Sequence, residues 1–500
     1  MADSGDGVGV RRRVGGLGVL RSRPAFVALA VLTLLVGGGG MPAEPAAPVI
    51  VLLRPAAAPV GARARQVADE LGARNGWRAS HVYAHTIDGF AARLTSAQQT
   101  ALRRDPRVSA IVPDELIELV EHEDAEPIVD TTTGETPANI QSTPSSEPTP
   151  SVAPDPTPTP APTATPRTKP PTPGPARQIV PTGVRRIGRP ALNAWPINGA
   201  NLQVNIDIAI VDTGVSPHPD LNLVGGKNCI GGRKWHDGNG HGTHVAGTAA
   251  ALDNDFGVVG VAPGARIWSV KVLNKYGRGY ASWLLCGIDW ITAQREGGRA
   301  MIEVANLSLR FRGAERPADD GNCGQIIGDA IHRATCRSVG RGTIYVAAAG
   351  NDRRNAANYR PAGYREVITV SALSDFDGRP GAKGNLLDVC PAGWTRDRDD
   401  RMLRVSNFGR VIQIMAPGKC IWSTNRNGGY RQMSGTSMAT PHVAGAVALY
   451  LLHYPDASAN AIRAALIACG TQDWVHASDR DSWHEPLLNL DVMCAPEPPT

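Results

Sequence analysis

The chain has 500 residues, which is too long for one ordinary domain, and its composition changes sharply along its length. Hydrophobic residues make up 42% of the sequence and charged residues 19%, so there is enough apolar material for a large core. The formal net charge of +5 is small for this length and argues against nucleic acid as the main partner.

All eight cysteines lie in the C-terminal part of the chain, beyond residue 228. An even number of cysteines in an exported chain predicts up to four disulfides, although their spacing leaves the pairing open. No CxxC pair is present, which argues against a zinc ribbon.

Residues 1–46 are expected to be a signal peptide. An arginine cluster over residues 11–13 precedes an apolar run over residues 25–36, and glycines and other small residues follow. The run is too short to span a bilayer comfortably, although an uncleaved membrane anchor remains an alternative. We therefore expect a secreted, extracellular protein that contacts a membrane only if this segment stays attached.

Residues 47–120 are predicted to form a small α+β unit. Strand patterns cover residues 49–53 and 108–112, extended segments lie between residues 82 and 94, and helices are expected over residues 62–73 and from Thr95. Gln98 follows Thr95 by three residues, as in a capping box. The order β-α-β-β-α-β predicts a ferredoxin-like fold, and a generic small α+β domain is the alternative.

Residues 121–180 are expected to be a linker. The segment is first acidic and then rich in proline, threonine and serine. Such a composition cannot bury enough apolar surface to fold, so it predicts an extended, disordered spacer.

Residues 181–500 alternate apolar strand patterns with helical ones, which predicts an α/β domain with a parallel sheet. Candidate strands cover residues 204–211, 267–272, 302–308, 343–349, 367–372 and 411–416. Candidate helices cover residues 241–252, 281–296, 324–337, 437–454 and 457–468, with Pro441 in the first turn of its helix.

Three segments of this domain supply Asp, His and Ser. Asp212 follows the strand pattern over residues 204–211, His241 lies among glycines, and Ser437 opens a helix pattern after Gly435. A serine hydroxyl needs a base to remove its proton during attack, and imidazole titrates close to neutral pH. Taken alone, the serine segment is equally compatible with a tightly packed helix start that catalyses nothing.

Together with Ala-Ala-Gly-Asn at residues 348–351, these segments resemble the subtilisin-like serine proteases, or subtilases. The resemblance covers roughly residues 185–490, and the chain order Asp, His, Ser is that of subtilisin. It implies a three-layer, parallel-sheet catalytic domain in which His241 is the base, Asp212 orients it and Ser437 is the nucleophile. Asn351 and the backbone N–H of Ser437 would stabilise the oxyanion.

The resemblance extends to the small N-terminal unit and to the substrate-binding strand. Residues 88–94 and 106–114 resemble the inhibitory propeptide of subtilases. Ser308, Leu309 and Arg310 would lie along the substrate backbone, with Ala349 and Gly350 on the opposite wall. Two glycines commonly follow the leucine in the family, whereas this chain has Arg310 and Phe311. If Arg310 points into the cleft, we expect acidic or small residues at the cleavage position.

Neighbouring histidines and acids are interpreted as structural. His236 and His244 lie close to His241, but no HExxH pattern or acidic residue completes a set of metal ligands. Asp237 is expected to be a loop acid rather than a second catalytic acid.

A structural calcium ion is implied by the resemblance of residues 252–263 to a calcium-binding loop of subtilases. The ligands, listed by position, would be Asp220, Leu252, Asn254, Phe256 and Val258. Carbonyl and carboxylate oxygens suit this hard cation, although a solvated polar turn is the alternative. One ligand from near the mature N-terminus is left unassigned.

The sequence thus predicts a secreted serine endopeptidase, made as a self-processed zymogen, that acts on protein or peptide substrates. Its own propeptide would be an intramolecular inhibitor, no cofactor is needed for catalysis, and we expect a monomer. A dedicated processing or peptide-cyclising subtilase is one alternative. A non-catalytic binding module on the same scaffold is another, although all four signature residues are present.

Overall fold

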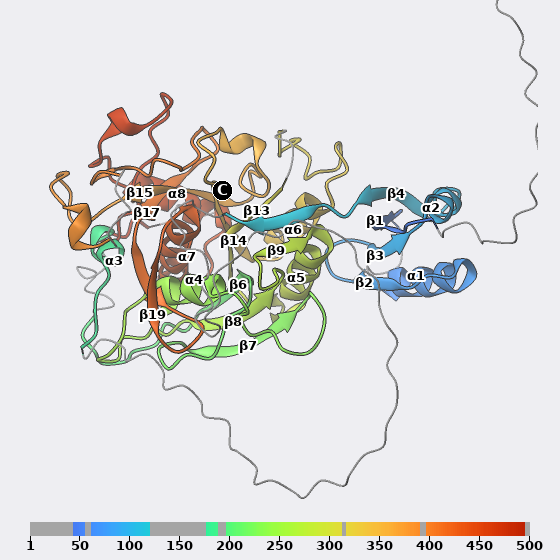
Figure 1. The fold of residues 1–500 in the computed structure, drawn as a ribbon, viewed down its shortest axis with the longest axis horizontal. Coiled ribbons are helices and arrows are strands. Elements are labelled where there is room, and N and C mark those ends of the chain that lie inside the picture. The colour runs from blue at the N-terminus through green and yellow to red at the C-terminus, as the bar shows by residue number, and fades with distance from the viewer. Residues whose placement is uncertain are drawn as a thin grey trace, which may run out of the picture. The chain divides into compact units, whose positions relative to one another are not determined.

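The computed structural model describes residues 44–55, 62–120, 177–188, 197–312, 317–390 and 397–495 (Figure 1). Nearly all of the predicted signal peptide and most of the predicted linker lie outside these ranges. Within them, no helix combines the length and hydropathy that crossing a membrane requires.

The N-terminal unit is a four-stranded antiparallel sheet in the order β2-β3-β1-β4 with two helices. Thr95 caps the second helix: its Oγ1 accepts a hydrogen bond of 3.2 Å from the N–H of Gln98, whose Oε1 accepts one of 2.9 Å from the N–H of Thr95. This confirms the predicted capping box and the β-α-β-β-α-β order. The elements are β1 (Ala47–Leu53), α1 (Ala62–Asn75), β2 (Ala79–Tyr83), β3 (Gly89–Leu94), α2 (Ser96–Arg103) and β4 (Val108–Pro113).

The large domain is built on an eight-stranded sheet in the order β16-β15-β14-β12-β6-β8-β7, with β17 also paired to β15. Seven strands are parallel and β16 is antiparallel, which confirms the predicted fold class. The strands are β6 (Asp207–Asp212), β7 (Leu223–Asn228), β8 (Arg266–Lys271), β12 (Val304–Leu307), β14 (Ile344–Ala348), β15 (Ile368–Ser374), β16 (Arg401–Met402) and β17 (Ile414–Pro417).

Helices cover both faces of this sheet (Figure 1). Side chains of a strand alternate between faces, so Ile208 and Ile210 of β6 join one buried cluster and Ala209 and Val211 join the other. The first cluster includes residues of α4 (His241–Ala250), α7 (Thr436–His453) and α8 (Ala459–Cys469). The second includes residues of α5 (Ala281–Ala293) and α6 (Ala330–Val339). Two helical layers therefore sandwich the sheet.

The structure corrects several predicted boundaries. The helix predicted over residues 324–337 begins only at Ala330, because Asp329 caps it by accepting from the N–H groups of Ile331 and His332. Strand β7 was not predicted, since the two glycines at its centre weaken the strand pattern. Pro441 lies in the second turn of α7, not the first, because the helix already begins at Thr436.

A small three-stranded sheet joins the N-terminal unit to the large domain. It has the order β13-β5-β9, with β5 (Leu116–Leu119) between β9 (Arg278–Tyr280) and β13 (Leu309–Phe311). Short hairpins are formed by β10 (Arg295–Glu296) with β11 (Arg299–Ala300) and by β18 (Ile421–Thr424) with β19 (Tyr430–Met433). The short helix α3 (Thr182–Arg186) precedes the large domain.

The cysteines form four disulfides, as the even count predicts. The pairs are Cys229–Cys286, Cys323–Cys336, Cys390–Cys420 and Cys469–Cys494.

Candidate active site

Asp212 and His241 form a buried pair at the carboxyl edge of the sheet. Asp212 is the last residue of β6 and His241 the first of α4. Nδ1 of His241 lies 2.9 Å from both carboxylate oxygens of Asp212. A ring nitrogen that donates to a carboxylate leaves the other nitrogen as an acceptor. Nε2 of His241 is buried and has no hydrogen-bond partner in the described part of the chain, so it is available to take a proton.

Asp237 organises the loop that leads into α4. Its Oδ1 accepts hydrogen bonds from the N–H groups of Asn239 and Gly240, both at 2.8 Å, and from Oγ1 of Thr213 at 2.9 Å. Its Oδ2 accepts from the N–H of Thr243 at 3.0 Å and from its Oγ1 at 2.7 Å. The side chain therefore ties the start of α4 to the end of β6, which confirms the expectation of a loop acid.

His244 is a structural residue. Its Nε2 lies 2.9 Å from the carbonyl oxygen of Ile421 and 3.1 Å from that of Arg431. Burial lowers the pKa of His244 to about 3, which keeps the ring neutral, so that Nε2 donates to the two carbonyls. This geometry holds β18 and β19 against α4 and does not suggest a metal site.

Ser437 is the second residue of α7, at a helix N-terminus where backbone N–H groups are unpaired. Its hydroxyl lies 3.4 Å from the carbonyl oxygen of Val120 and 3.3 Å from that of Ser308. Gly435, just before it, has φ of +136°, and an added Cβ there would lie 2.7 Å from Nδ2 of Asn351. Only glycine therefore fits beside Ser437.

Pro441 explains a contact that the sequence does not reveal. In a regular α-helix the N–H of residue 441 would donate to the carbonyl of Ser437, four positions earlier. Proline has no N–H, so this hydrogen bond is missing. Oγ of Ser308 donates to this carbonyl instead, at 2.9 Å, and in turn accepts from Nδ2 of Asn306 at 2.9 Å. The predicted substrate strand thus supports the first turn of the helix that carries the serine.

Asn351 follows β14 and directs its amide nitrogen at the same carbonyl as Ser437. Its Oδ1 accepts hydrogen bonds from the N–H and Oγ1 of Thr436, at 3.0 and 2.9 Å. Two donors on Oδ1 set the orientation of the amide, so Nδ2 points to the carbonyl oxygen of Val120, at 3.0 Å. Thr436 was not singled out from the sequence, because only the fold brings it to Asn351.

The chain segment that ends at Val120 lies in the site as an added strand (Figure 1). Leu119 pairs with Leu309 and Glu118 with Arg310 on β13, and Ile117 pairs with Gly279 on β9. This is β-augmentation, in which backbone pairing positions a peptide and side-chain contacts select it. The pairing places the bond after Val120 next to Ser437.

The predicted wall residues Ala349 and Gly350 lie directly before Asn351. Nδ2 of Asn407 donates to the carbonyl of Ala349 at 2.8 Å, and the N–H of Gly350 donates to Oγ1 of Thr436 at 3.2 Å. Gly350 has φ of +107°, and an added Cβ would lie 2.3 Å from Nδ2 of Asn407. Asn407, which the sequence did not single out, therefore holds this wall in place.

Arg310 does not contact the residue at the cleavage position. Its guanidinium bonds Asp352 through Nη1 and Glu118 through Nη2, the latter at 3.1 Å. Glu118 is two residues before Val120, so Arg310 does not contact the residue whose carbonyl lies beside Ser437, and the conditional preference for acidic or small residues at the cleavage position stays a prediction. The strand register places Arg310 opposite Glu118.

The predicted calcium ligands gather around Asp220, which is fully buried. Its Oδ2 accepts hydrogen bonds from the N–H of Val258 at 3.0 Å and from the hydroxyl of Tyr430 at 3.1 Å. Its Oδ1 is buried without a partner among the described residues, and burial raises the pKa of this carboxyl to about 7. A cation at Oδ1 would satisfy this orphaned oxygen, so the residues fit calcium.

Gln178 lies beside this loop and is a candidate for the ligand that the sequence left unassigned. Its Nε2 lies 2.9 Å from the carbonyl oxygen of Leu252, and its N–H donates to the carbonyl of Asp255 at 2.9 Å. Asn254 and Phe256 lie in the same turn, where Oδ1 of Asn254 accepts from the N–H of Phe256 at 3.4 Å. The side-chain amide of Gln178 therefore lies at the rim of the loop, where a turn of the amide would present an oxygen.

A second acidic group was not predicted. Oxygens of Asp375, Asp377 and Asp399 lie within 4.8 Å of one another. Backbone N–H groups already donate to Asp375 and Asp399, and Nε of Arg186 lies 3.7 Å from Asp375. Burial raises the pKa of Asp375 to about 8.

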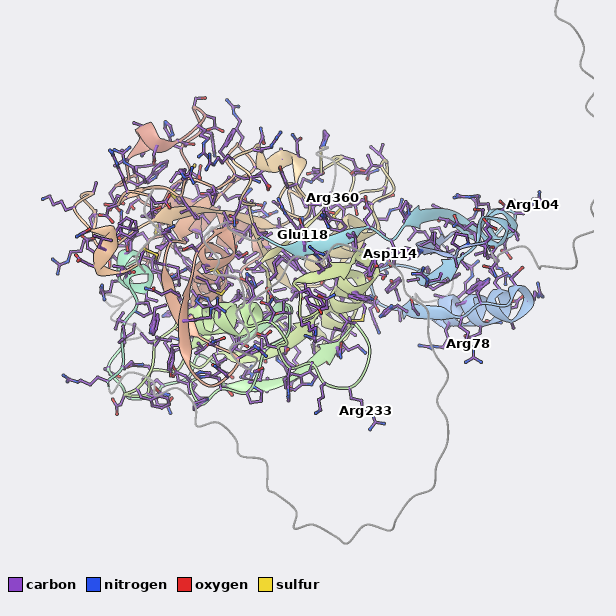
Figure 2. The ribbon with its side chains drawn as sticks, in the orientation of Figure 1. Arg78, Arg104, Asp114, Glu118, Arg233 and Arg360 are labelled. Atoms are coloured by element: carbon purple, nitrogen blue, oxygen red, sulfur yellow. A yellow bond between two sulfur atoms is a disulfide. The ribbon has the colours of Figure 1, made fainter. Side chains whose placement is uncertain are left out.

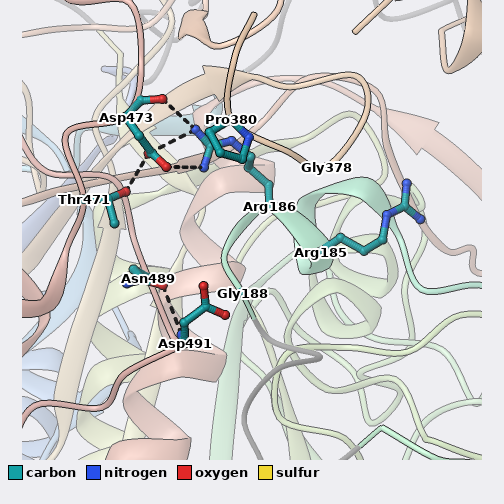
Figure 3. A pocket seen from close by; sticks show the side chains of 9 residues that line it. All are labelled: Arg185, Arg186, Gly188, Gly378, Pro380, Thr471, Asp473, Asn489 and Asp491. Atoms are coloured by element: carbon teal, nitrogen blue, oxygen red, sulfur yellow. Dashed lines mark hydrogen bonds and ion pairs between the residues drawn. The ribbon is translucent and has the colours of Figure 1, made fainter. Parts of the chain in front are cut away.

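A cavity of about 330 Å³ is lined in part by Arg186 and Gly378, which both contact Asp375 (Figure 3). Arg186 crosses it to reach Asp473, with Nη2 at 3.1 Å from Oδ1. Its other lining residues are Arg185, Gly188, Pro380, Thr471, Asn489 and Asp491. None of the predicted catalytic residues lines this cavity.

Comparisons with known proteins agree with this geometry. Residues 204–479 match the subtilase family and residues 60–120 match the peptidase inhibitor I9 family. Subtilisin DY of Bacillus licheniformis is 37% identical over 321 residues, which are 63% of this chain and 98% of that protein. Subtilisin BL of Lederbergia lenta is 38% identical over 287 residues, which are 57% of this chain and 89% of that protein.

A crystal structure of a cold-adapted subtilisin-like serine proteinase matches 58% of this chain and 90% of that chain, with 29% identity and a TM-score of 0.45. The subtilase match spans more than half of the 500 residues and includes Asp212, His241, Asn351 and Ser437. The chain therefore belongs to the subtilase family: it is a subtilisin-like serine endopeptidase that carries an I9 inhibitor propeptide.

Proposed function

We propose that this subtilase is made as an inactive precursor that cuts its own chain between Val120 and Glu121 and then hydrolyses proteins and peptides. One observation carries the proposal: the carbonyl oxygen of Val120 lies 3.0 Å from Nδ2 of Asn351 and 3.4 Å from Oγ of Ser437. The nucleophile and an oxyanion donor thus meet at one peptide carbonyl. The cut falls at the predicted boundary between the propeptide and the linker, at residues 120 and 121.

The proposed chemistry assigns one role each to Asp212, His241, Ser437 and Asn351. Oγ of Ser437 attacks the carbonyl carbon while Nε2 of His241 accepts its proton, and Asp212 holds the other ring nitrogen. Nδ2 of Asn351 and the N–H of Ser437 bind the oxyanion. The tetrahedral intermediate collapses as His241 protonates the leaving amine, which gives an acyl-enzyme. Water then attacks the ester with His241 as the base, which releases the acid and restores Ser437.

We propose that the chain has four parts and that the first cut separates the second part from the third. Residues 1–46 are a signal peptide, residues 47–120 the inhibitory propeptide, residues 121–180 a linker and residues 181–500 the catalytic domain. Four disulfides support secretion, because they persist in oxidising compartments. We propose that the mature enzyme is an extracellular monomer.

Calcium is proposed as a structural ion. Asp220, Asn254 and the carbonyl oxygens of Leu252, Phe256 and Val258 would hold it, with the side chain of Gln178 as a further ligand. A bound ion would stabilise the folded state by linking the segment that begins at Gln178 to the loop after α4. In this proposal the catalytic steps are performed by Asp212, His241, Ser437 and Asn351.

A dedicated processing or peptide-cyclising enzyme is the second candidate. The observation that favours it is Arg310, which stands where the family has glycine and which contacts a charged side chain of the strand in the cleft. A processing enzyme would leave unfolded casein nearly intact, whereas a general endopeptidase would degrade it to small peptides. Casein digestion therefore separates the two.

Ser437→Ala tests the proposed function, with Ser458→Ala as the matched control, because Ser458 is an exposed residue that caps α8. Purified precursors of both variants are incubated with casein. We expect Ser458→Ala to mature and digest casein, and Ser437→Ala to stay uncut and inactive while it melts cooperatively. Maturation of Ser437→Ala in the absence of other proteases would contradict self-processing.

A further inference from the structure

We infer that this enzyme selects substrates with a carboxylate at the third residue before the cut, and that Arg310, Arg312 and Arg278 recognise it. The inference rests on the proposed function, because it takes Val120 as the residue before the cut. In the propeptide strand the third residue is Glu118. We call the three arginines the acid-recognition site.

Glu118 lies between arginines on both neighbouring strands. It pairs with Arg310 on β13 and with Arg278 on β9. Side chains directly opposite each other in antiparallel strands lie on the same face and interact. Nη2 of Arg310 lies 3.1 Å from Oε1 of Glu118, and Nε of Arg312 lies 3.6 Å from Oε2. Both carboxylate oxygens thus face a guanidinium.

Arg310 is held ready for this contact. Its Nη1 bonds Asp352, which leaves Nη2 directed at the cleft. The side chains of Arg310 and Glu118 are 24% and 20% exposed, so solvent screens their pairing less than it screens a surface ion pair. A neutral side chain in place of Glu118 would leave this partly desolvated donor unpaired, and a lysine would add a like charge.

A second contact of the same kind lies three residues upstream of Glu118 and involves Arg360; Figure 2 labels Glu118 and Arg360. Nη1 and Nη2 of Arg360 lie 2.9 and 3.0 Å from the carboxylate of Glu115. The guanidinium of Arg360 stacks at 4.2 Å over the ring of Phe311, the other residue that stands where the family has glycine. Both departures from the family pattern thus take part in contacts to acidic residues of the strand.

The contacts extend to substrates because backbone pairing sets the register. A peptide that pairs with β9 and β13 as β5 does places its third residue before the cut opposite Arg310 and Arg278. The substrate class is therefore a peptide with glutamate or aspartate at that position, followed by two apolar residues, like Glu118-Leu119-Val120.

The test uses the mature enzyme and three peptides that carry a chromogenic leaving group after Ile-Glu-Leu-Val, Ile-Gln-Leu-Val or Ile-Lys-Leu-Val. We expect kcat/KM for the Glu peptide to exceed that for the Gln peptide by about tenfold, because hydrogen bonds from a guanidinium to a carboxylate are stronger than those to a neutral amide. The Lys peptide should be slower still. The Glu/Gln ratio should fall with rising salt, a readout that requires no variant.

Arg310→Gln should bring the Glu/Gln ratio close to one, and Arg312→Gln should reduce it less. Arg299→Gln is the matched control, because Arg299 forms an exposed ion pair with Asp456 on the surface, and it should keep the wild-type ratio. Equal rates on the Glu and Gln peptides by an enzyme that digests casein would overturn the inference alone. An unchanged ratio in Arg310→Gln would also overturn it. Failure to cleave casein and all three peptides would overturn the proposed function as well.

Discussion

The side-chain amide of Asn351 donates a 3.0 Å hydrogen bond to the carbonyl oxygen of Val120, a residue 231 positions earlier in the chain. The propeptide thus occupies the oxyanion site of the domain that it inhibits. Asn351 is itself held by Thr436, the neighbour of the nucleophile. Under the proposed function, the inhibitor and the first substrate of this enzyme are the same strand.

Asn351→Ala removes the side-chain donor to the oxyanion. We expect kcat on a peptide substrate to fall by about 10²–10³ with little change in KM, because this donor acts mainly on the charge of the transition state. Steady-state kinetics of the mature variant measure this. Asn427→Ala, in an exposed loop, is the control. A loss confined to KM would show that Asn351 binds substrate instead.

Removal of calcium should destabilise the Ser437→Ala protein, which cannot digest itself. At a calcium concentration 100-fold above Kd the ion contributes about 2.7 kcal/mol, so chelation should lower Tm. Asp220→Ala should abolish the difference between calcium and chelator in thermal melts. Asp377→Asn, in the second acidic group, should keep it. If Asp377→Asn removes the response and Asp220→Ala does not, the assigned loop is not the site.

Asp289→Ala should weaken inhibition by the separately expressed propeptide, residues 47–120. The carboxylate of Asp289 accepts four hydrogen bonds from the propeptide turn, from the N–H groups of Ala84, His85 and Thr86 and from Oγ1 of Thr86, at 2.8–2.9 Å. We expect the inhibition constant to rise about 10- to 100-fold, because hydrogen bonds to a charged group are lost.

Inhibition of casein digestion measures the effect of Asp289→Ala. Asp456→Ala, at a surface ion pair far from the propeptide in sequence, is the control and should bind the propeptide normally. An inhibition constant that is equal in both variants would show that the Asp289 contacts do not contribute to binding.

Glu485→Gln should stabilise the protein at alkaline pH. Burial raises the pKa of Glu485 from 4.5 to about 8, and its Oε2 has no partner among the described residues. Between pH 4.5 and about pH 8 the carboxyl of Glu485 is ionised in the unfolded state but protonated in the folded state. The free energy of unfolding therefore falls as pH rises, by at most about 1.4 kcal/mol per pH unit. Thermal melts in the Ser437→Ala background at pH 5 and pH 8 measure this.

Apart from any effect of the altered side-chain geometry, Glu485→Gln should melt at the same temperature as its parent at pH 5. At pH 8 it should melt at a higher temperature than its parent. Glu296→Gln, at an exposed position, should shift neither melt. An advantage of Glu485→Gln that is the same at both pH values would show that Glu485 does not titrate between them.

Local patterns predicted most of the large sheet and the residues at its carboxyl edge. Alternating apolar stretches revealed β6, and Asp212 follows from its place at the end of that strand. Strand β7 escaped prediction because its central glycines carry no side chain to show a pattern. The helix was predicted to start at Ser437, one residue too late, and Pro441 was assigned to its first turn, although it is the sixth residue of α7.

Contacts between distant segments could not be read from local patterns. The pairing of Glu118 with Arg310 depends on the register of β5 between two strands that are more than 150 residues further along the chain. Gln178 reaches the loop over residues 252–258 only because its segment pairs with Asp255 and Gly257. The contact of Thr436 with Asn351 likewise depends on the fold, which brings the start of α7 to the carboxyl end of β14.

The first cut in the precursor tests the central claim most directly. Purified wild-type and Ser437→Ala precursors are incubated without other proteases, and intact-mass and N-terminal mass spectrometry identify the products. We predict one early cut between Val120 and Glu121 in the wild type and none in Ser437→Ala, because Val120 presents its carbonyl to Ser437 and Asn351. A first cut elsewhere, or the same cut in Ser437→Ala, would contradict this account.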